Sequence, residues 1–406
     1  MMQRKPTHKT PDTLNLLTLR RNYTNPHQLY TSLREQGALH FDSTSQCWLV
    51  TGHQLTASML DDPRFISGLG SGSASKSTSG RFSPVSRQML FMDGETHHKA
   101  QAVMLRPLAQ MVKEMPPTIS KIAQDAIQAV SATGEIDAVS QFAAPISLLT
   151  IAHVLGIPTE DRELLQQLEQ WSDTFGDITS GYFRGAGQDV QRLEEYFRQL
   201  ITQKRRHPDE SLLSAFIAAH DIFPEEDDLV ANCMMVFAAG RITSKKLLGN
   251  GLTFLTQHWQ QYQAEMQTNP HFIKALGEEL LRIITPTRYL IREASEDIVF
   301  PVSASHTQRI QQGQRVLLFL EAANYDPAIF PHPTTFDPHR RPNKHVAFGF
   351  GPHQCPGATL ARMETQLALE TIFTLSNLRP KPGVKPSWNP NPNLGGYTHN
   401  PLIFSR

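Results

Sequence analysis

The feature of this sequence that most constrains the fold is a long run of helical periodicity. From Pro107 to about Gln267, apolar residues recur at spacings of three and four, as they do from Ile119 to Val130. Because an α-helix has 3.6 residues per turn, this spacing places the apolar side chains on one face of each helix. Gly156 followed by Pro158 predicts the end of one helix, and the polar residues 159–161 predict the start of the next. This half of the chain is therefore predicted to be a set of packed helices.

A smaller β part is expected after the helices. Short β-prone segments run from Asp297 to Val302 and from Arg315 to Phe319, with Gly313 between them. A last helical run from Ala358 to about Ser376 precedes a tail rich in Pro, Gly and Asn, which suits turns or a hairpin but not a helix. The Ser- and Gly-rich tract from Ser67 to Ser86 is predicted to be a mobile loop.

Length and composition indicate one enzyme-sized body. The chain has 406 residues, of which 39% are hydrophobic and 19% are charged, as in ordinary globular proteins. We expect a single domain over residues 1–406, mainly α with a minor β part. Its helical bulk is expected at about 90–285 and 358–376, and its β-rich parts at about 37–60, 290–325 and 380–406.

Charge, hydropathy and cysteine content exclude several functional classes. Lys+Arg and Asp+Glu are equal at 38 each, and no basic stripe interleaved with aromatics is present, which disfavours nucleic-acid binding. The apolar stretch from Cys233 to Ala239 is far too short to span a bilayer, and the start of the chain is polar, so a cytoplasmic protein without a membrane anchor is expected. Three widely separated cysteines argue against disulfides and CxxC metal sites.

The most informative segment is the ten residues from Phe348 to Gly357, FGFGPHQCPG, directly before the last helical run. Glycines allow close approach of a flat partner, and a cysteine just ahead of a helix start has its thiolate favoured by free N–H groups and the helix dipole. Such a loop can present Cys355 to a metal ion. The alternative is a structural cysteine in a glycine-rich turn, because free cysteine usually behaves as a small apolar residue.

This segment resembles the cysteine loop of the cytochrome P450 family, F-G-x-G-x-H-x-C-x-G, which residues 348–357 match in full. The resemblance implies the cytochrome P450 fold and heme b (iron protoporphyrin IX) as cofactor. It implies that Cys355 is the axial thiolate ligand of the iron, whose electron donation favours O–O cleavage. It also assigns Phe348, Gly349 and Gly357 to the wall that holds the heme.

A second family element, E-x-x-R, is matched by Glu279 and Arg282, which a spacing of three puts on one helix face. The same spacing occurs at Glu195 and Arg198, where a solvated ion pair is the better interpretation. In the family a further arginine completes the cluster, and the segment FDPHR assigns Arg340 to it, with Arg341 as the alternative. The resemblance implies a structural role, an ion network that braces the heme-side loop.

Similarity to soluble bacterial P450s extends over nearly the whole chain and implies four residues that hold the heme propionates. These residues are His97, Arg292, His345 and His353. The family pattern H-x-x-x-R departs at its last position, where Gln101 stands in place of arginine, and Lys99 is a candidate substitute.

The family's oxygen-activating helix pattern, A-G-x-(Asp/Glu)-Thr-(Thr/Ser), is matched from Ala239 and Gly240 to Ser244, with Thr243 as the alcohol. Ile242 stands where the family has an acid, so the usual proton feed to the alcohol is missing. Arg241 and Lys245 are expected to point away from the heme. An alternative for Thr243 is a hydroxyl that bonds its own i−4 carbonyl.

Three functions remain open at this stage. The first is a monooxygenase of secondary metabolism that inserts one oxygen atom into a small, largely apolar metabolite. Its electrons would come from a separate ferredoxin or flavodoxin-like donor with its reductase, because the chain has no flavin or iron–sulfur motif. The second is a heme-thiolate enzyme that uses peroxide, oxidative coupling or substrate-assisted proton delivery. The third is a non-catalytic heme-binding module. The pocket walls that the resemblance implies are residues 66–90, 173–187, 286–290 and 393–397.

Overall fold

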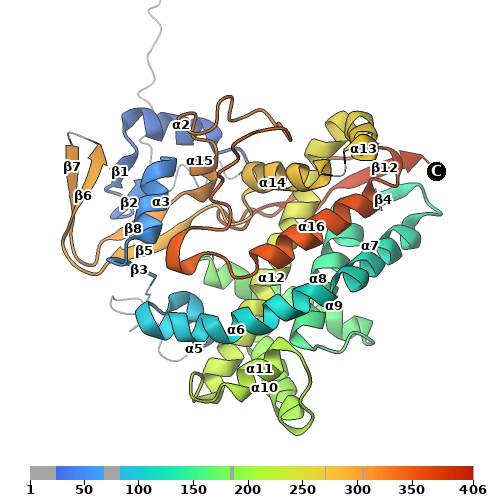
Figure 1. The fold of residues 1–406 in the computed structure, drawn as a ribbon, viewed down its shortest axis with the longest axis horizontal. Helices are drawn as coiled ribbons and strands as arrows, with labels where there is room; N and C mark the ends of the chain where they lie inside the picture. The colour runs from blue at the N-terminus through green and yellow to red at the C-terminus, as the bar shows by residue number, and fades with distance from the viewer. Residues whose placement is uncertain (1–23, 68–82, 183–186, 270, 304–305, 406) are drawn as a thin grey trace, which may run out of the picture.

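Helices form the larger part of the computed structural model, which describes residues 24–67, 83–182, 187–269, 271–303 and 306–405 (Figure 1). The longer helices are α2 (His27–Gln36), α6 (Gly94–Glu114), α7 (Pro116–Val130), α8 (Ala144–Leu155), α9 (Arg162–Thr179), α10 (Gly187–Arg206), α12 (Glu226–Leu255), α13 (Trp259–Thr268), α14 (Phe272–Ile284) and α16 (Ala358–Ile372). Shorter ones are α3 (His53–Asp61), α5 (Ser83–Ser86), α11 (Leu212–Ala218) and α15 (Leu320–Asn324). Single turns of other helix types are η1 (Met89–Phe91), η2 (Ala138–Ala143), η3 (Thr256–His258) and η4 (Gly351–His353).

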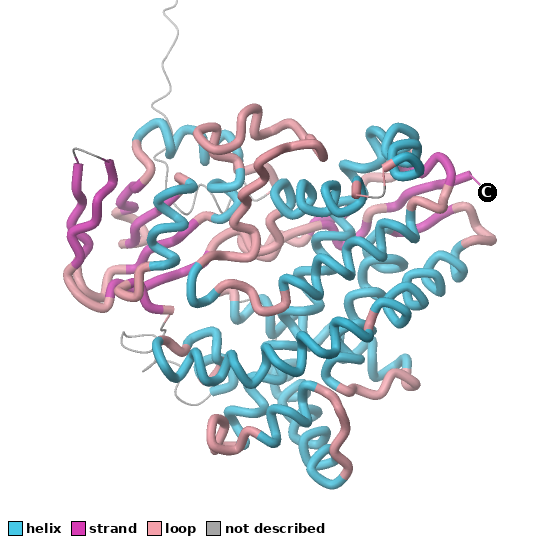
Figure 2. The backbone as a smooth tube through the Cα atoms, in the orientation of Figure 1, coloured by secondary structure: helices cyan, strands magenta, loops and turns pink. Residues whose placement is uncertain are grey.

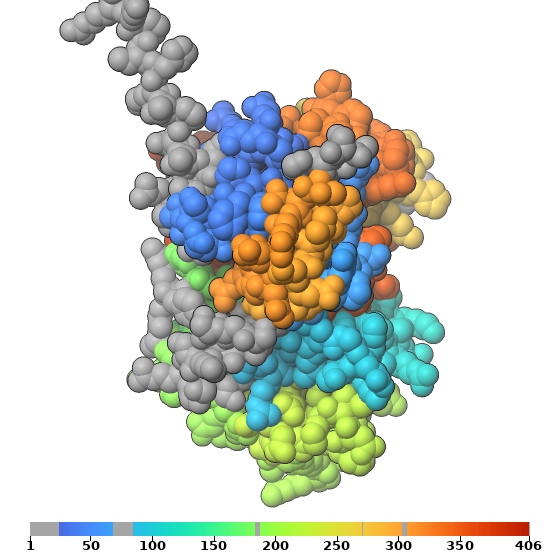
Figure 3. All heavy atoms as spheres, turned by 90° about the vertical axis from the view of Figure 1, so that its left-hand side faces the viewer, coloured from blue at the N-terminus to red at the C-terminus, as the bar shows by residue number. Residues whose placement is uncertain are grey.

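The strands gather mainly at one side of the molecule, as the magenta segments of Figure 2 show. The largest sheet has the order β1-β2-β8-β5-β3, in which only the β2–β8 pair is parallel. Its strands are β1 (Leu39–Asp42), β2 (Cys47–Val50), β8 (Arg315–Leu318), β5 (Leu290–Ala294) and β3 (Phe65–Ile66). The antiparallel pair of β6 (Ile298–Ser303) and β7 (His306–Ile310) lies beside the blue N-terminal segment on the face shown in Figure 3.

The tail of the chain returns to the helical half. A three-stranded sheet has the order β4-β12-β9, and β10 pairs with β11. These strands are β4 (Glu135–Asp137), β9 (Ser376–Pro380), β10 (Ser387–Trp388), β11 (Tyr397–His399) and β12 (Pro401–Ser405). The prediction of turns or a hairpin in the tail is thus confirmed, as are the two β-prone segments after Ala294.

Helix α12 runs through the centre of the helical half and contacts α8, α9, α10, α14 and α16. Two apolar clusters meet along it, one with α6 to α11 and one with α7, α14 and α16. Both predicted helix boundaries hold: Gly156 ends α8 in the left-handed conformation at φ 68°, and the Asp161 carboxylate accepts the N–H of Leu164 at the start of α9. The prediction of a mainly α fold with a minor β part is confirmed.

The predicted Ser- and Gly-rich loop and one long apolar stretch are the remaining features of the fold. The predicted mobile loop from Ser67 to Ser86 lies largely outside the described residues, and its end is wrong because residues 83–86 form α5. Among the described residues, one stretch, Ala138–Leu155, is long and apolar enough to cross a membrane, and 72% of it is buried in the protein interior. Its burial is explained by packing of η2 and α8 against α12.

Candidate active site

The cysteine loop is a turn that places Cys355 just before the start of α16. The Cys355 N–H donates to the Phe348 carbonyl at 2.9 Å, which closes the loop. Gly349 and Gly351 have φ near +70°, a conformation that side chains disfavour. A Cβ at Gly351 would also lie 2.7 Å from the carbonyl oxygen of Leu60. The glycines are therefore required by backbone geometry and by the close approach of α3.

Cys355 is exposed, whereas Cys47 and Cys233 are buried. The surrounding protein atoms nevertheless raise the pKa of the Cys355 thiol by desolvation, and the Gly357 N–H and Arg362 oppose this shift. Of the three cysteines, Cys355 is therefore the one that a ligand can reach.

On α12 the residues of the expected oxygen-side segment also border accessible space. Ala239 is exposed and Thr243 is half-buried, although their neighbours Ala238 and Ile242 are buried. The Thr243 hydroxyl donates to the Ala239 carbonyl at 2.7 Å, the i−4 bond given above as an alternative. A Cβ at Gly240 would lie 2.6 Å from Cδ1 of Ile151 on α8, so helix packing explains this glycine.

Ile242, which replaces the family's acid, is a packing residue. A Cβ built on Gly176 of α9 would overlap Cδ1 of Ile242, and Leu394 lies nearby. The glycine thus makes room for the isoleucine, and the two helices approach closely there. The interpretation of Ile242 as a packing choice is favoured by this contact.

Arg241 and Lys245 point away from that accessible space, as predicted, and join α12 to α9. We call them, with Glu169 and Asp173, the α12–α9 cluster. Arg241 has a fully buried side chain that contacts both acids, at 3.1 Å for Glu169, and donates to Ser172 Oγ at 3.0 Å. Lys245 contacts the same acids at 3.1 and 3.0 Å. Burial would raise the pKa of Asp173, but the two cations hold it below its usual range.

Two further buried ionisable groups flank this segment of α12. The Ser244 hydroxyl lies 3.2 Å from Oε2 of Glu364 on α16, and burial raises the pKa of Glu364 to about 8. Lys246 Nζ donates to the carbonyls of Pro286 and Asn393, at 2.7 and 3.4 Å, and burial lowers its pKa well below the usual value. Lys246 therefore joins two segments that the resemblance assigns to the pocket wall.

A buried cationic group lies on the other side of the cysteine loop. Arg292 is 5% exposed, donates to the Ile291 carbonyl at 2.9 Å and forms no salt bridge with a described residue. Burial lowers the pKa of Arg292 to about 10. A buried guanidinium without an ion pair is costly, so this environment fits an anionic group such as a heme propionate.

Two of the predicted histidines lie next to each other. His97 and His353 stack with ring centroids 3.9 Å apart, and burial lowers the pKa of His97 to about 4. His353 Nε2 lies 3.2 Å from Asp93. Burial would raise the pKa of Asp93, but hydrogen bonds from His353 and the Ser67 N–H, with Arg292 nearby, keep it low. The structure therefore brings together His97 and His353, with an unpredicted acid beside them.

Other predicted heme contacts lie elsewhere. The side chain of His345 is 3% exposed and its Nε2 is 3.1 Å from Glu278, which also binds Arg362 at 2.6 Å. Nε2 of His345 thus contacts an acid of α14, and a contact of the ring with a propionate stays a prediction. Lys99 is an unsuitable substitute, because it pairs with Glu95 on the exposed face of α6. Gln101 reaches the cysteine loop, where its Nε2 donates to the Pro352 carbonyl at 3.4 Å.

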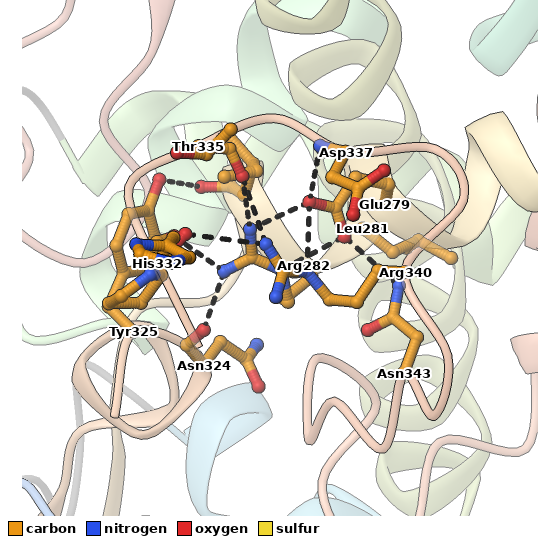
Figure 4. A network of polar contacts seen from close by, with 12 residues as sticks. Glu279, Leu281, Arg282, Asn324, Tyr325, His332, Thr335, Asp337, Arg340 and Asn343 are labelled. Carbon is orange, nitrogen blue, oxygen red and sulfur yellow. Dashed lines mark hydrogen bonds and ion pairs between the residues drawn. The ribbon is translucent and has the colours of Figure 1, made fainter. Parts of the chain in front are cut away.

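Figure 4 shows the α14 cluster, which consists of Glu279, Arg282 and Arg340. Arg282 binds both oxygens of Glu279, at 2.9 and 2.7 Å, and both side chains are 0% exposed. Arg340 contacts the same carboxylate at 3.3 Å, whereas Arg341 donates to a backbone carbonyl of its neighbour. The solvated pair expected at Glu195 is wrong in one respect, since Arg198 binds Glu194 instead, at 2.7 Å.

The α14 cluster is joined to the cysteine loop by short links. Nη1 of Arg282 donates to the Asn324 carbonyl at 2.9 Å. The Asn324 side chain in turn accepts the Val346 N–H at 2.8 Å. Asn343 also donates to Glu279, at 3.1 Å. The loop that begins at Phe348 is thus preceded by residues fixed to the cluster.

Sequence reasoning missed the roles of Gly176, Glu364 and Lys246. One signal was available for the two ionisable residues, since each lies among the apolar residues that its helix buries. No sequence spacing relates Glu364 to Ser244, because 120 residues separate them.

The chain is similar over most of its length to known proteins. The family model described as Cytochrome P450 matches residues 6–404. The chain is 32% identical over 366 residues to a biotin biosynthesis cytochrome P450 of Bacillus subtilis, covering 86% of this chain and 88% of that protein. It is 30% identical to a mycinamicin VIII C21 methyl hydroxylase of Micromonospora griseorubida, covering 81% and 82%. The crystal structure of P450BioI with an acyl carrier protein carrying hexadec-9Z-enoic acid matches with TM-score 0.85 at 28% identity, covering 95% and 100%.

Proposed function

The chain belongs to the cytochrome P450 family, and from that membership we propose that it is a heme-thiolate monooxygenase whose iron ligand is Cys355. Enzymes of this family are oxidoreductases that bind heme b. The observation that carries the assignment is the exposed Cys355 in a loop that its N–H closes by donating to the Phe348 carbonyl, just before the start of α16. When bound through a thiolate, heme supplies the electron-rich iron that favours cleavage of dioxygen.

Arg292, His97 and His353 are the residues we propose for the propionates. The support is the buried guanidinium of Arg292, which forms no salt bridge with a described residue, and the stacked imidazoles of His97 and His353. Phe348 and Gly349 shape the loop, and the α14 cluster braces it. His345 contacts Glu278, and its contact with a propionate stays a prediction.

On the opposite wall, Thr243 is the hydroxyl we propose for orienting water next to the substrate, with Ala239 as the small residue that leaves room. Since the Thr243 proton is donated to the Ala239 carbonyl, the oxygen of the hydroxyl is free to accept a hydrogen bond. A hydroxyl in this state positions a proton donor but does not itself supply the proton.

We propose a small, largely apolar metabolite as substrate and a separate ferredoxin or flavodoxin-like protein, with its reductase, as electron donor in the cytoplasm. The names of the relatives include hydroxylase and biosynthesis enzymes. The buried Ile242 and the half-buried Leu394 near the pocket segments suit an apolar ligand. The second candidate, a peroxide-driven enzyme, is favoured by Ile242 at the place of the acid.

The iron ligand is tested on heme-loaded protein, reduced and exposed to carbon monoxide. We expect the red-shifted Soret band that marks thiolate ligation, its loss in Cys355→Ser and its retention in the matched control Cys47→Ser. Retention of that band in Cys355→Ser would overturn the assignment.

The electron route is tested by turnover. Product formation with NADPH and surrogate redox proteins, at a rate well above that with hydrogen peroxide, is expected for a monooxygenase. The reverse order would favour the peroxide-driven alternative. A screen of apolar compounds, read by the spin-state shift of the Soret band, identifies the substrate class.

A further inference from the structure

Two polar side chains of α12 bind the tail of the chain. Lys246 and Asn250 are four residues apart and therefore lie on one face of the helix. Asn250 Oδ1 accepts the Tyr397 N–H at 2.8 Å, and Lys246 Nζ donates to the Asn393 carbonyl at 3.4 Å. A Cβ at Gly396 would lie 3.0 Å from Asn250 Nδ2 and 3.1 Å from Lys246 Cγ. This part of the tail thus lies directly against α12.

Lys246 also binds a second segment, the turn between α14 and β5. Its Nζ donates to the Pro286 carbonyl at 2.7 Å. The turn and the tail are in addition joined to each other, because the Arg288 N–H donates to the Asn393 carbonyl at 3.3 Å and the Tyr289 N–H donates to Asn393 Oδ1 at 3.0 Å. The two joined segments are therefore attached to α12 through one nitrogen atom of Lys246.

The contacts of Lys246 depend on reach and donors more than on charge. Lys246 is 6% exposed, and none of the salt bridges between described residues includes it. Burial lowers the pKa of Lys246 well below its usual value, and the charged side chains that act on it, Arg288 and Glu321, contact each other at 3.3 Å. An ammonium group has three N–H donors and a neutral amine has two, so both carbonyl bonds can form in either state.

The attachment point lies close to the proposed oxygen-side residue. Lys246 follows Thr243 by three residues, which is about 4.5 Å along the helix axis. Leu394 comes directly after the carbonyl that Lys246 binds, and it packs against the apolar cluster that contains Ile242. A shift of the tail along α12 would therefore move an apolar side chain relative to Thr243.

We propose that Lys246 is a positioning residue, which fixes the two joined segments relative to Thr243 and so decides which apolar substrates fit between them. This inference rests on the proposed monooxygenase function. Without the Nζ bonds, the segments stay joined through Asn393 but can shift along α12. A ligand that packs against them must then order them on binding, which weakens its affinity. A ligand too small to touch them is not affected.

The first test uses heme-loaded protein and two azoles that coordinate heme iron, imidazole and the bulkier 4-phenylimidazole. The shift of the Soret band gives both dissociation constants. In Lys246→Met, which keeps an unbranched chain without donors, we expect the dissociation constant of 4-phenylimidazole to rise about tenfold and that of imidazole to stay within about twofold. The control is Leu255→Ala, which removes a buried apolar side chain of the same helix and destabilises the fold without removing a hydrogen bond to either segment.

The second test reads the two segments directly by hydrogen–deuterium exchange. Backbone N–H groups in residues 287–289 and 393–397 should exchange about tenfold faster in Lys246→Met than in the parent protein, because both segments lose their attachment to α12. Exchange in α16 should be unchanged. A joint change in two segments that lie about 100 residues apart in the sequence is expected only if one residue holds both.

An unchanged ratio of the two dissociation constants in Lys246→Met, an equal rise in Leu255→Ala, or unchanged exchange in both segments would overturn the proposal. Lys246→Gln has an amide donor on a chain one atom shorter, so we expect an intermediate ratio, and this variant replaces the methionine variant if the latter loads no heme. If the parent protein shows no thiolate band with carbon monoxide, the proposed function fails, while the exchange rates still show whether Lys246 holds the segments.

Discussion

The two charged clusters of this protein are built in different ways. In the α14 cluster one carboxylate, Glu279, serves two guanidiniums, whose other N–H groups reach backbone carbonyls such as those of Pro331 and Thr335. In the α12–α9 cluster two acids serve two cations, and the contacts are mostly between side chains. Glu279 is 0% exposed, whereas the Asp173 side chain is 45% exposed.

This difference predicts how each cluster responds when one of its charged side chains is removed. Water cannot replace a lost partner of Glu279, because no part of that side chain reaches solvent. Asp173 can be hydrated when a cation is removed, and Lys245 remains to neutralise it. The α14 cluster should therefore be essential for folding, while the α12–α9 cluster should tune how firmly two helices are joined.

The largest expected effect is the loss of Glu279. Glu279→Ala leaves two guanidiniums without their shared carboxylate, which costs about 3–5 kcal/mol of the free energy of unfolding. We expect little soluble protein with heme, measured by yield and by the absorbance ratio of the Soret band to the protein band. Lys274→Ala, on the exposed face of the same helix, is the control. Normal heme content in Glu279→Ala would show that the α14 cluster is not essential for folding.

A smaller effect is expected from the other cluster. Arg241→Met removes the fully buried cation but keeps Lys245, so we expect a loss of about 1–3 kcal/mol with heme still bound. Urea unfolding followed by circular dichroism measures the change. If Arg241→Met abolishes heme loading as Glu279→Ala does, the two clusters are equivalent and the distinction is wrong.

The comparison is sharpened by Glu364, a buried carboxyl with no cation. Folded Glu364 keeps its proton up to a pKa of about 8, against an ordinary value of 4.5. Its contribution to the free energy of unfolding is fully present below that ordinary value and is lost as the pH rises toward 8. The loss is at most about 1.4 kcal/mol per pH unit. Urea unfolding at several pH values should show this fall in the free energy of unfolding for the parent protein but not for Glu364→Gln. The same pH dependence in both proteins would contradict the prediction.

The smallest effect concerns the apolar contact beside the α12–α9 cluster. Gly176→Ala places a methyl group against Cδ1 of Ile242 and should cost about 1 kcal/mol through overpacking. Ile242→Val removes that atom, so the double variant should be more stable than the sum of the single changes predicts. Additive losses in thermal unfolding would show that the helices can separate without cost.

Much of the α14 cluster was predictable from the sequence. Glu279 and Arg282 are three residues apart on one helix, and local spacing is enough to place them together. The choice between Arg340 and Arg341 depended on family resemblance, and the structure gives the contact to Arg340. The orientation of Arg241 away from the accessible space also followed from helical geometry.

The partners across the fold could not be predicted. Arg241 meets acids about 70 residues earlier in the chain, and Ser244 meets an acid 120 residues later. Helical periodicity gives the face on which a residue lies but not the helix that packs against it. For the same reason the contact of His345 with Glu278 on α14 was not predicted.

The backbone acceptors of the α14 cluster have a consequence for sequence change. Arg282 and Arg340 donate to main-chain oxygens of residues 331–335, which every amino acid carries. The identities of the acceptor residues are therefore weakly constrained by these bonds, and those of the two donors are strongly constrained. In a saturation-mutagenesis screen for heme loading, the arginines should tolerate almost no substitution, lysine included, because only the guanidinium fork supplies so many directed N–H groups. Thr335 should accept many substitutions, and the course of this loop would be preserved while its sequence changes.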